Sequence, residues 1–122
     1  MMNVAIILAG GTGTRVGANL PKQFIQVNGK PILAYTLEIF QKNKNIDFIE
    51  IVCHRDLLGE VERICTQYSI TKKRWMCVGG DEFQESTING IYNLKGKISD
   101  NYIVVISFGV SPLTHKKILT IV

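Results

Sequence analysis

Short hydrophobic runs alternate along this chain with longer stretches in which apolar residues recur at helical spacing. The short runs are rich in β-branched residues and predict four strands, at residues 3–9, 48–53, 74–78 and 102–106. The longer stretches predict helices at residues 31–40, 57–68 and 86–94, and a further helix at residues 113–122. Strands and helices therefore alternate, which is the order of an α/β protein.

This alternation also predicts how the elements are arranged. Strands joined through helices pair in parallel by right-handed crossovers, so we expect a Rossmann-like parallel sheet with helices on both faces. A chain of 122 residues has the size of one domain, and residues 1–122 are expected to form a single unit. Ligands of such sheets bind beyond the carboxyl ends of the strands. Candidate functional residues are therefore sought in the loops that follow the strands.

The last predicted helix has an unusual end. It stops on Ile121 and Val122, with neither a glycine cap nor a polar tail. We therefore expect the chain to be cut short, with part of the active site missing.

Composition and charge narrow the class of ligand. Hydrophobic residues make up 46% and charged residues 20% of the sequence, as in globular proteins. The formal net charge is +4 and, apart from residues 72–74, the basic residues are dispersed, which argues against a nucleic-acid partner and for a small anionic ligand. The longest strongly apolar stretch, residues 4–9, is too short to cross a bilayer and follows no signal-like leader. We expect a cytoplasmic protein without a membrane partner.

The cysteines and histidines indicate no metal centre. Cys53, Cys65 and Cys77 are odd in number and form no C-x-x-C pair, so we expect reduced, structural cysteines and no protein metal site. His54 follows the second predicted strand, beside Asp56, and is expected to belong to a helix-initiating loop.

The strongest chemical signal follows the first predicted strand, where the chain reads LAGGTGTR at residues 8–15. Glycines let backbone N–H groups approach phosphate oxygens, and an arginine can bind two oxygens at once. The Walker A and dinucleotide patterns do not fit, because the Gly-Lys-Ser/Thr segment and the third glycine are missing. A turn that only reverses the chain is the plain alternative. We predict a phosphate-binding loop with the candidate residues Gly10, Gly11, Thr12, Gly13, Thr14 and Arg15.

A second basic residue, Lys22, lies in the segment PKQF at residues 21–24. The proline restrains the loop and presents the lysine as a compact, movable cation. A lone lysine is most often a solvated surface charge. Together with the glycine-rich loop, Lys22 becomes a second candidate phosphate ligand.

The chain resembles the cytidylyltransferases that activate 2-C-methyl-D-erythritol 4-phosphate or D-ribitol 5-phosphate. The resemblance runs over the whole chain, in the family's order and spacing. It rests on LAGGTGTRVG at residues 8–17, PKQF at 21–24, GKPILAYTLEIF at 29–40 and GGDEFQESTINGI at 79–91. It implies a fold of the nucleotide-diphospho-sugar transferase type. Members of the family are much longer, and their second half carries a dimerising arm, so the resemblance implies a homodimer at full length.

The resemblance also implies an activity. The phosphate of a polyol phosphate attacks the α-phosphorus of CTP, and pyrophosphate leaves with Mg²⁺ bound. Arg15 and Lys22 match the family's catalytic basic pair, which would stabilise the anionic transition state. The positions that resemble the family's cytosine and ribose contacts are Ala9, Gly10, Gly80, Asp81 and Ser86. Without the resemblance, the plain alternative is that Gly80 only belongs to a turn that ends a strand and that Ser86 is only a helix cap.

Three charged residues of the family pattern are absent. The fourth strand should lead into a His-Asp-Ala-Ala-Arg-Pro-like segment, but this chain has SFGVSP at residues 107–112. Phe108 replaces the aspartate that helps to hold Mg²⁺, and Ser111 and Phe83 each replace an arginine.

These replacements leave several interpretations open. One is a divergent cytidylyltransferase, in which the triphosphate itself supplies much of the magnesium shell. Another is a nucleotide-binding relative with little turnover. A third, a nicotinamide-binding oxidoreductase, has an acidic residue in Asp56 but lacks the required glycine pattern. Gly10 after Ala9 resembles the ribitol branch, which hints at the acceptor without deciding it.

Overall fold

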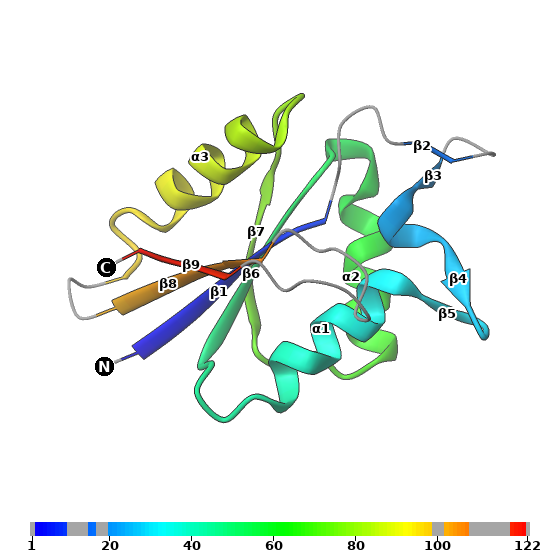
Figure 1. The fold of residues 1–122 in the computed structure, drawn as a ribbon, viewed down its shortest axis with the longest axis horizontal. Coiled ribbons are helices and arrows are strands. Elements are labelled where there is room, and N and C mark those ends of the chain that lie inside the picture. Colours follow the sequence, from blue (N-terminus) through cyan, green and yellow to red (C-terminus); the bar gives the residue numbers. More distant parts are fainter. Residues whose placement is uncertain (1, 10–14, 17–19, 99–101, 108–117, 122) are drawn as a thin grey trace.

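A five-stranded sheet forms the centre of the molecule (Figure 1). The computed structural model describes residues 2–9, 15–16, 20–98, 102–107 and 118–121. The strand order is β7-β6-β1-β8-β9, and β9 alone runs antiparallel to its neighbour. The strands are β1 (Met2–Leu8), β6 (Phe48–Cys53), β7 (Lys73–Val78), β8 (Tyr102–Ser107) and β9 (Ile118–Ile121).

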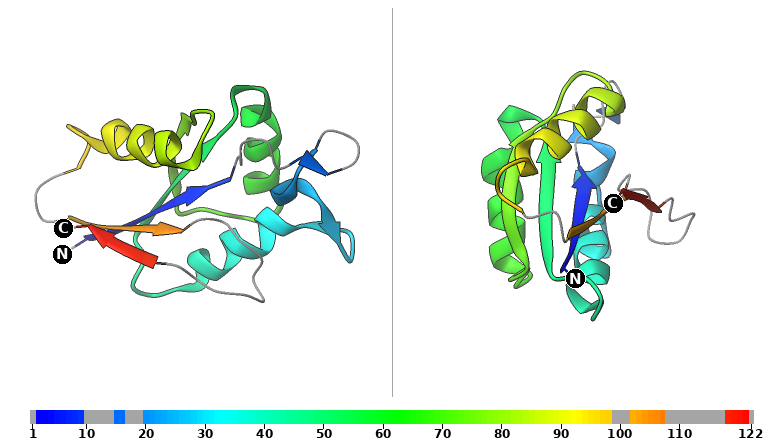
Figure 2. Two further views of the ribbon diagram at one scale, coloured as in Figure 1. Left: turned by 45° about the horizontal axis from the view of Figure 1, so that its top comes forward. Right: turned by 90° about the vertical axis from the view of Figure 1, so that its left-hand side faces the viewer.

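Helices cover both faces of the sheet. They are α1 (Ile32–Lys42), α2 (Leu58–Gln67) and α3 (Phe83–Leu94). Figure 2 shows α1 and α3 on opposite sides of the strands. The expected α/β sheet with helices on both faces is therefore confirmed, except that its last described strand is antiparallel.

Two hydrophobic clusters hold these layers together. In β1, Ala5 and Ile7 pack with α1 and α2, whereas Val4 and Ile6 pack on the α3 side. Neighbouring positions belong to different clusters because successive side chains of a strand point to opposite faces. Because β1 is buried on both faces, its sequence is a continuous hydrophobic run and does not alternate with polar residues.

Two short ribbons lie beside the sheet. Strands β2 (Arg15–Val16) and β3 (Leu20–Pro21) form one, and β4 (Gln26–Val27) and β5 (Lys30–Pro31) form the other. Asn28 and Gly29 connect β4 to β5 with φ angles of 55° and 77°. Both φ angles are positive, as a two-residue hairpin turn requires. A 3₁₀ turn, η1 (Lys22–Phe24), joins the ribbons, and a second, η2 (Arg55–Leu57), precedes α2.

The sequence predicted β1, β6, β7 and β8 within one residue at each end, but it missed the short strands β2 to β5, and its last predicted helix is wrong. Residues 118–121 form β9, whereas residues 113–117 and 122 lie outside the described part of the chain. The segment ILTI is rich in β-branched residues, and pairing with β8 satisfies the backbone N–H and C=O groups on one side. Helix α3 also begins three residues before the predicted start, at Phe83. Among the described helices, none is long and apolar enough to cross a membrane.

Candidate functional site

The carboxyl ends of β1, β6 and β7 are tied together by backbone hydrogen bonds. The amide of Ala9 donates to the carbonyl of Val52 at 2.8 Å, and the amide of Gly79 donates to the carbonyl of Cys53, also at 2.8 Å. The start of the glycine-rich loop and the Gly79–Gly80 turn therefore flank the same end of β6. Sheets of this type bind ligands at this edge.

The backbone also brings the two predicted basic residues together. Arg15 of β2 pairs with Pro21 of β3, and Lys22 follows Pro21 directly. Pro21 has φ −60° and an extended ψ of 151°, which turns the chain from β3 into η1. Phe24, at the end of η1, is buried and fixes the turn to the core. Arg15 and Lys22 are thus seven positions apart in the sequence, but the antiparallel ribbon brings their backbones close together.

The side chains of Lys22 and Lys30 differ in whether their charge already has a partner in the protein. Lys22 is exposed, and its ammonium group has no hydrogen bond or ion pair to a described residue. Lys30 forms an ion pair with Glu38, and its Nζ lies 4.5 Å from the ring centroid of Tyr35 and 5.2 Å from that of Tyr68. Its charge is already used by a carboxylate and two aromatic rings. Of these two lysines, Lys22 is the one available to an anionic ligand.

The second half of the candidate site is the turn between β7 and α3. Gly80 donates its amide hydrogen to Ser86 Oγ at 3.1 Å, and Ser86 is buried. Ser86 is not the helix cap that sequence alone also allowed, because α3 already begins at Phe83. The amides of Ala9 and Gly80 therefore both have protein acceptors and are not available as donors to a ligand.

The acidic residues near this turn do not form a metal site. Asp81 and Glu82 are exposed, and Glu85 lies in the first turn of α3. Within residues 2–9, 15–16, 20–98, 102–107 and 118–121, no three His, Cys, Asp or Glu side chains lie together as metal ligands. The described chain thus does not supply a complete site for the Mg²⁺ that the family resemblance implies.

Several predicted positions lie outside the described residues. They are the loop positions Gly10, Gly11, Thr12, Gly13 and Thr14, together with Phe108 and Ser111. Their roles stay predictions. Phe83, which replaces a family arginine, is described: it opens α3 and is 55% exposed.

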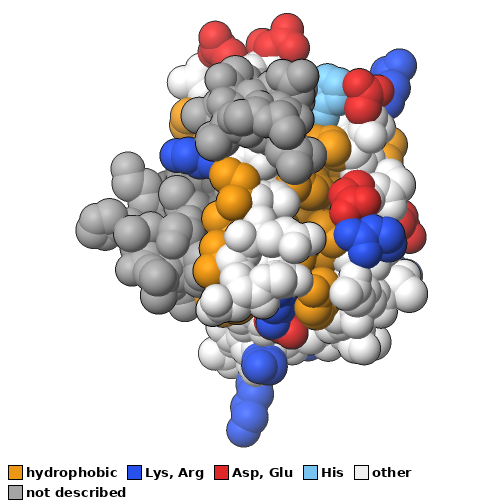
Figure 3. All heavy atoms as spheres, turned by 90° about the vertical axis from the view of Figure 1, so that its right-hand side faces the viewer, with side chains coloured by type: hydrophobic (Ala, Val, Ile, Leu, Met, Phe, Trp, Pro, Cys, Tyr) orange, Lys and Arg blue, Asp and Glu red, His pale blue; other side chains and the backbone are white. Residues whose placement is uncertain are grey.

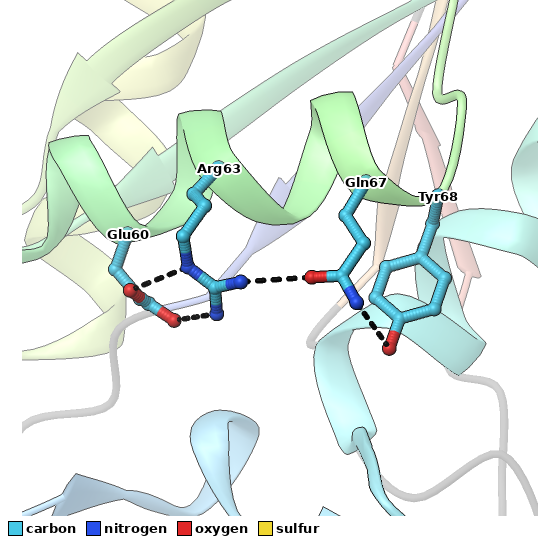
Figure 4. Close-up of polar contacts among 4 residues, drawn as sticks. All are labelled: Glu60, Arg63, Gln67 and Tyr68. Carbon is cyan, nitrogen blue, oxygen red and sulfur yellow. Dashed lines mark hydrogen bonds and ion pairs between the residues drawn. The ribbon is translucent and has the colours of Figure 1, made fainter.

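A chain of polar contacts runs along α2 and ends at Tyr68 (Figure 4). Glu60 accepts hydrogen bonds from Arg63, and Arg63 also donates to Gln67 Oε1 at 2.8 Å. The hydrogen bond from Arg63 lowers the pKa of the Glu60 carboxyl. The Arg63 guanidinium already binds Glu60, and the whole cluster is exposed. These residues therefore form a solvated network on the helix surface and not a phosphate site.

The surface at the ribbon end of the molecule is shown in Figure 3. Hydrophobic side chains form a band there, and charged side chains lie around it without gathering into one basic patch among the described atoms. A triphosphate bound at this end would therefore depend on individual cations. Lys22 and Arg15 lie on the elements closest in sequence to the glycine-rich loop.

Among the residues that the structure describes, Glu50 is a buried acid that sequence reasoning missed. Glu50 lies in β6 on the α3 side and is 0% exposed. Its Oε2 accepts a hydrogen bond from Asn93 Nδ2 at 2.7 Å, and its Oε1 has no partner among the described residues. Burial raises its pKa from 4.5 to about 7, against smaller lowering effects of Asn93 and Lys97. The sequence feature that could have revealed Glu50 is a carboxylate in the middle of the otherwise apolar strand FIEIVC.

The remaining candidates are structural. His54 Nδ1 accepts the amide hydrogen of Asp56 at 3.2 Å and so caps η2, in agreement with the predicted helix-initiating loop. The three cysteines are free, and burial raises the thiol pKa of Cys53 to about 12 and those of Cys65 and Cys77 to about 11. Thiols with such pKa values stay protonated at neutral pH and are poor nucleophiles.

Comparison with known proteins shows which family has this sequence and fold. A model of the 2-C-methyl-D-erythritol 4-phosphate cytidylyltransferase family matches residues 3–122. The chain is 40% identical to the ribitol-5-phosphate cytidylyltransferase of Vibrio parahaemolyticus, over 97% of this chain and 50% of that protein. It is also 40% identical to the 2-C-methyl-D-erythritol 4-phosphate cytidylyltransferase of Clostridium novyi, over 96% of this chain and 49% of that one.

The fold agrees with these matches. The crystal structure of 4-diphosphocytidyl-2C-methyl-D-erythritol synthase from Anaerococcus prevotii superposes with a TM-score of 0.68 at 27% identity, covering 92% of this chain and 44% of that structure. This chain thus spans about half the length of the relatives that it matches. Because the family model matches nearly every residue, the protein belongs to the 2-C-methyl-D-erythritol 4-phosphate cytidylyltransferase family.

Proposed function

We propose that this chain is the CTP-binding part of a cytidylyltransferase that acts on a polyol phosphate, either D-ribitol 5-phosphate or 2-C-methyl-D-erythritol 4-phosphate. The observation that carries the proposal is the pairing of Arg15 with Pro21, which sets the exposed Lys22 beside Arg15 along the backbone. This pair follows the glycine-rich loop at the carboxyl end of β1. Family membership and relatives named for both acceptors support it.

In the proposed reaction, an oxygen of the acceptor phosphate forms a bond to the α-phosphorus of CTP. The bond from that phosphorus to the oxygen bridging to the β-phosphate breaks, and the electron pair leaves with pyrophosphate. Negative charge gathers on the transferred group and on the leaving group. Arg15 and Lys22 would stabilise this charge, Arg15 with a two-oxygen fork and Lys22 as a movable cation.

The same proposal assigns the nucleoside end to the edge formed by Ala9, Gly80, Asp81 and Ser86. The amides of Ala9 and Gly80 already have protein acceptors, so their carbonyl oxygens would receive hydrogen bonds. The amino group of cytosine is a donor, whereas the corresponding carbonyl of uracil is not. Carbonyl oxygens at this edge would therefore favour CTP over UTP.

Binding of CTP tests the proposal directly. Titration calorimetry on the 122-residue chain should show binding that Lys22→Ala weakens about tenfold, the loss expected for one charge-assisted contact. Lys44→Ala is the matched control, because Lys44 is an exposed lysine that follows α1, outside the candidate site. Equal affinity of both variants for CTP would remove Lys22 from the site.

A second candidate function is nucleotide binding with little turnover. The replacement of the family's aspartate by Phe108 in the sequence favours this alternative. Pyrophosphate release should be measured with CTP, Mg²⁺ and each acceptor in turn. Release of pyrophosphate that is lost in Lys22→Ala supports the transferase. Binding of CTP without release of pyrophosphate supports the nucleotide-binding alternative. The nicotinamide alternative has no support from the family match.

Location and assembly belong to the same proposal. We place the protein in the cytoplasm, where its three free cysteines stay reduced. We also propose that the full-length protein is a homodimer, as the family resemblance implies, and that neither nucleic acid nor a membrane is a partner. Light scattering of the longer protein and its distribution after cell fractionation would test both statements.

A further inference from the structure

Helix α3 has one face on the sheet and one face that points away from it. On the inner face, Ser86, Gly90 and Leu94 are buried at four-residue spacing. On the same side, Asn89 Nδ2 donates to the carbonyl of Val78 in β7 at 3.2 Å. Figure 2 shows α3 as the outer layer on its side of the strands. The residues on the opposite face of the helix are therefore directed outward.

The outer face of α3 is apolar at its centre. Ile88, Ile91 and Tyr92 are 52%, 36% and 66% exposed. Of the large hydrophobic side chains that are exposed in the described part of the chain, only Met2 and Val27 lie outside this helix. Exposed apolar side chains gain free energy when another surface removes them from water, and a group of them marks an interaction surface more than single ones do.

The outer face of α2 shows that a helix on this sheet can have a polar surface. Glu62, Arg63, Thr66 and Gln67 are exposed on α2, and all four side chains are polar. This composition is the usual one for a helix face in contact with water. The apolar surface of α3 is therefore not a general consequence of lying on the outside of the sheet.

The charges at the two ends of α3 indicate which partner this face fits. Glu85 lies in the first turn and Lys95 directly follows the last residue of the helix, and both are exposed. Glu85 comes three residues before Ile88 and Lys95 comes seven residues after it, so at helical spacing both border the same face. Nζ of Lys95 lies 5.8 Å from the ring centroid of Tyr92, beside the apolar centre. The face is therefore acidic at one end, apolar in the middle and basic at the other end.

We propose that this face binds α3 of a second copy of the chain, with the two helices antiparallel and related by a two-fold axis at the level of Gly90. Glu85 and Lys95 are each five positions from Gly90, so the axis sets Glu85 of one copy opposite Lys95 of the other, twice. Ile88 and Tyr92, each two positions from Gly90, meet in the same way. A parallel arrangement would bring like charges together, which opposes binding.

This contact differs from the dimer that the family resemblance implies. The dimerising arm of the family belongs to its second half, whereas α3 lies within this chain. The contact involves neither Arg15 nor Lys22, so it holds or fails independently of the proposed function. A surface of about three helical turns is small, and we expect association at high micromolar concentration.

Sedimentation equilibrium of the 122-residue chain tests the association. The mass should rise from that of a monomer at about 10 μM toward that of a dimer at about 1 mM. Ile88→Glu places a charge at the centre of the face and should keep the chain monomeric throughout this range. Thr66→Glu is the matched control, because Thr66 is exposed on α2, and this variant should associate like the unmodified chain. Melting temperatures measured alongside show whether each variant is folded.

Two charge reversals test the antiparallel arrangement. Glu85→Lys and Lys95→Glu each turn two attractive contacts of the dimer into two repulsive ones, so each should raise the dissociation constant about three- to tenfold. One variant is then basic at both ends of the face and the other is acidic at both ends. In an equimolar mixture, a dimer with one copy of each variant has two attractive contacts again. Mixed dimers should therefore form about as tightly as dimers of the unmodified chain.

Three results would overturn the proposal. The first is a chain that stays monomeric at about 1 mM. The second is a dimer that Ile88→Glu leaves intact, because such a dimer uses another surface. The third is a dissociation constant that the single charge reversals do not change, because the helices then do not pair antiparallel through Glu85 and Lys95.

Discussion

At the scale of single residues, the clearest physical consequence comes from the buried carboxyl of Glu50. Its pKa is raised by burial from 4.5 to about 7, so the folded chain keeps a proton that the unfolded chain releases. The free energy of unfolding should therefore fall as the pH rises from 4.5 to 7, by about 3 kcal/mol from this group. Urea denaturation of Glu50→Gln, compared with the unmodified chain at several pH values, measures this contribution.

The glutamine is a close test because it retains the acceptor for Asn93 and cannot ionise. Among the described groups facing Glu50, Lys97 of the segment after α3 favours ionisation, and Cys77 of β7 is a protonated thiol. We expect Glu50→Gln to be more stable than the unmodified chain above pH 7, with the difference shrinking toward pH 5. A constant difference across this range would show that Glu50 does not titrate there.

Residue by residue, the sequence predicts what is local and misses what depends on packing. The pairing of Lys22 with a glycine-rich loop can be read from spacing, and so can a turn at Gly80. Asn89 gave no signal of its own, because its bond to Val78 exists only once α3 has packed on β7. Glu50 was visible as a charge in an apolar strand, but its burial depends on the space left by Gly90.

At the scale of elements, Gly90 determines how closely α3 approaches the sheet. A Cβ atom there would lie 3.0 Å from Glu50 Oε1, 3.0 Å from Val52 Cγ2 and 3.1 Å from Ile6 Cγ2. Alanine normally favours a helix over glycine by about 1 kcal/mol, but overpacking against a sheet costs about 1–3 kcal/mol. We expect Gly90→Ala to lower the free energy of unfolding by up to about 2 kcal/mol.

Gly59 in α2 provides the matched control for this substitution. A Cβ atom at Gly59 has no atom within 4 Å apart from its near neighbours in the chain. Gly59→Ala should therefore raise the free energy of unfolding by about 0.5–1 kcal/mol, because only the helix preference changes. Thermal denaturation of Gly59→Ala and Gly90→Ala tests this explanation. Equal shifts of the melting temperature with the same sign would mean that contact with the sheet has no effect at position 90.

The strand β9 shows where prediction of elements from the sequence fails. The segment around residues 113–122 contains apolar residues that suit one face of a helix as well as a strand, and periodicity cannot separate these over a short run. The free edge of β8 decides in favour of the strand, because residues 104–107 offer backbone partners to residues 118–121. The strands β1, β6 and β8 needed no such context, since each contains a clear β-branched or hydrophobic run.

At the scale of the whole molecule, charge should govern the response of nucleotide binding to salt. The net charge of +4 and the exposed Lys22 attract a triphosphate, and ions screen this attraction. Raising the ionic strength from about 0.05 to about 0.5 M should weaken CTP binding severalfold. Cytidine, which carries no phosphate, is the control ligand. Equal salt dependence of CTP and cytidine would mean that binding does not involve the basic loop.

The buried acid in β6 also links folding of the whole molecule to the surrounding buffer. Between pH 4.5 and 7 the chain takes up part of a proton at Glu50 as it folds, and the buffer must supply that proton. The heat of unfolding measured near pH 6 therefore includes the heat of buffer ionisation. Two buffers with different ionisation enthalpies would give different apparent enthalpies for the unmodified chain, and this difference would be smaller for Glu50→Gln.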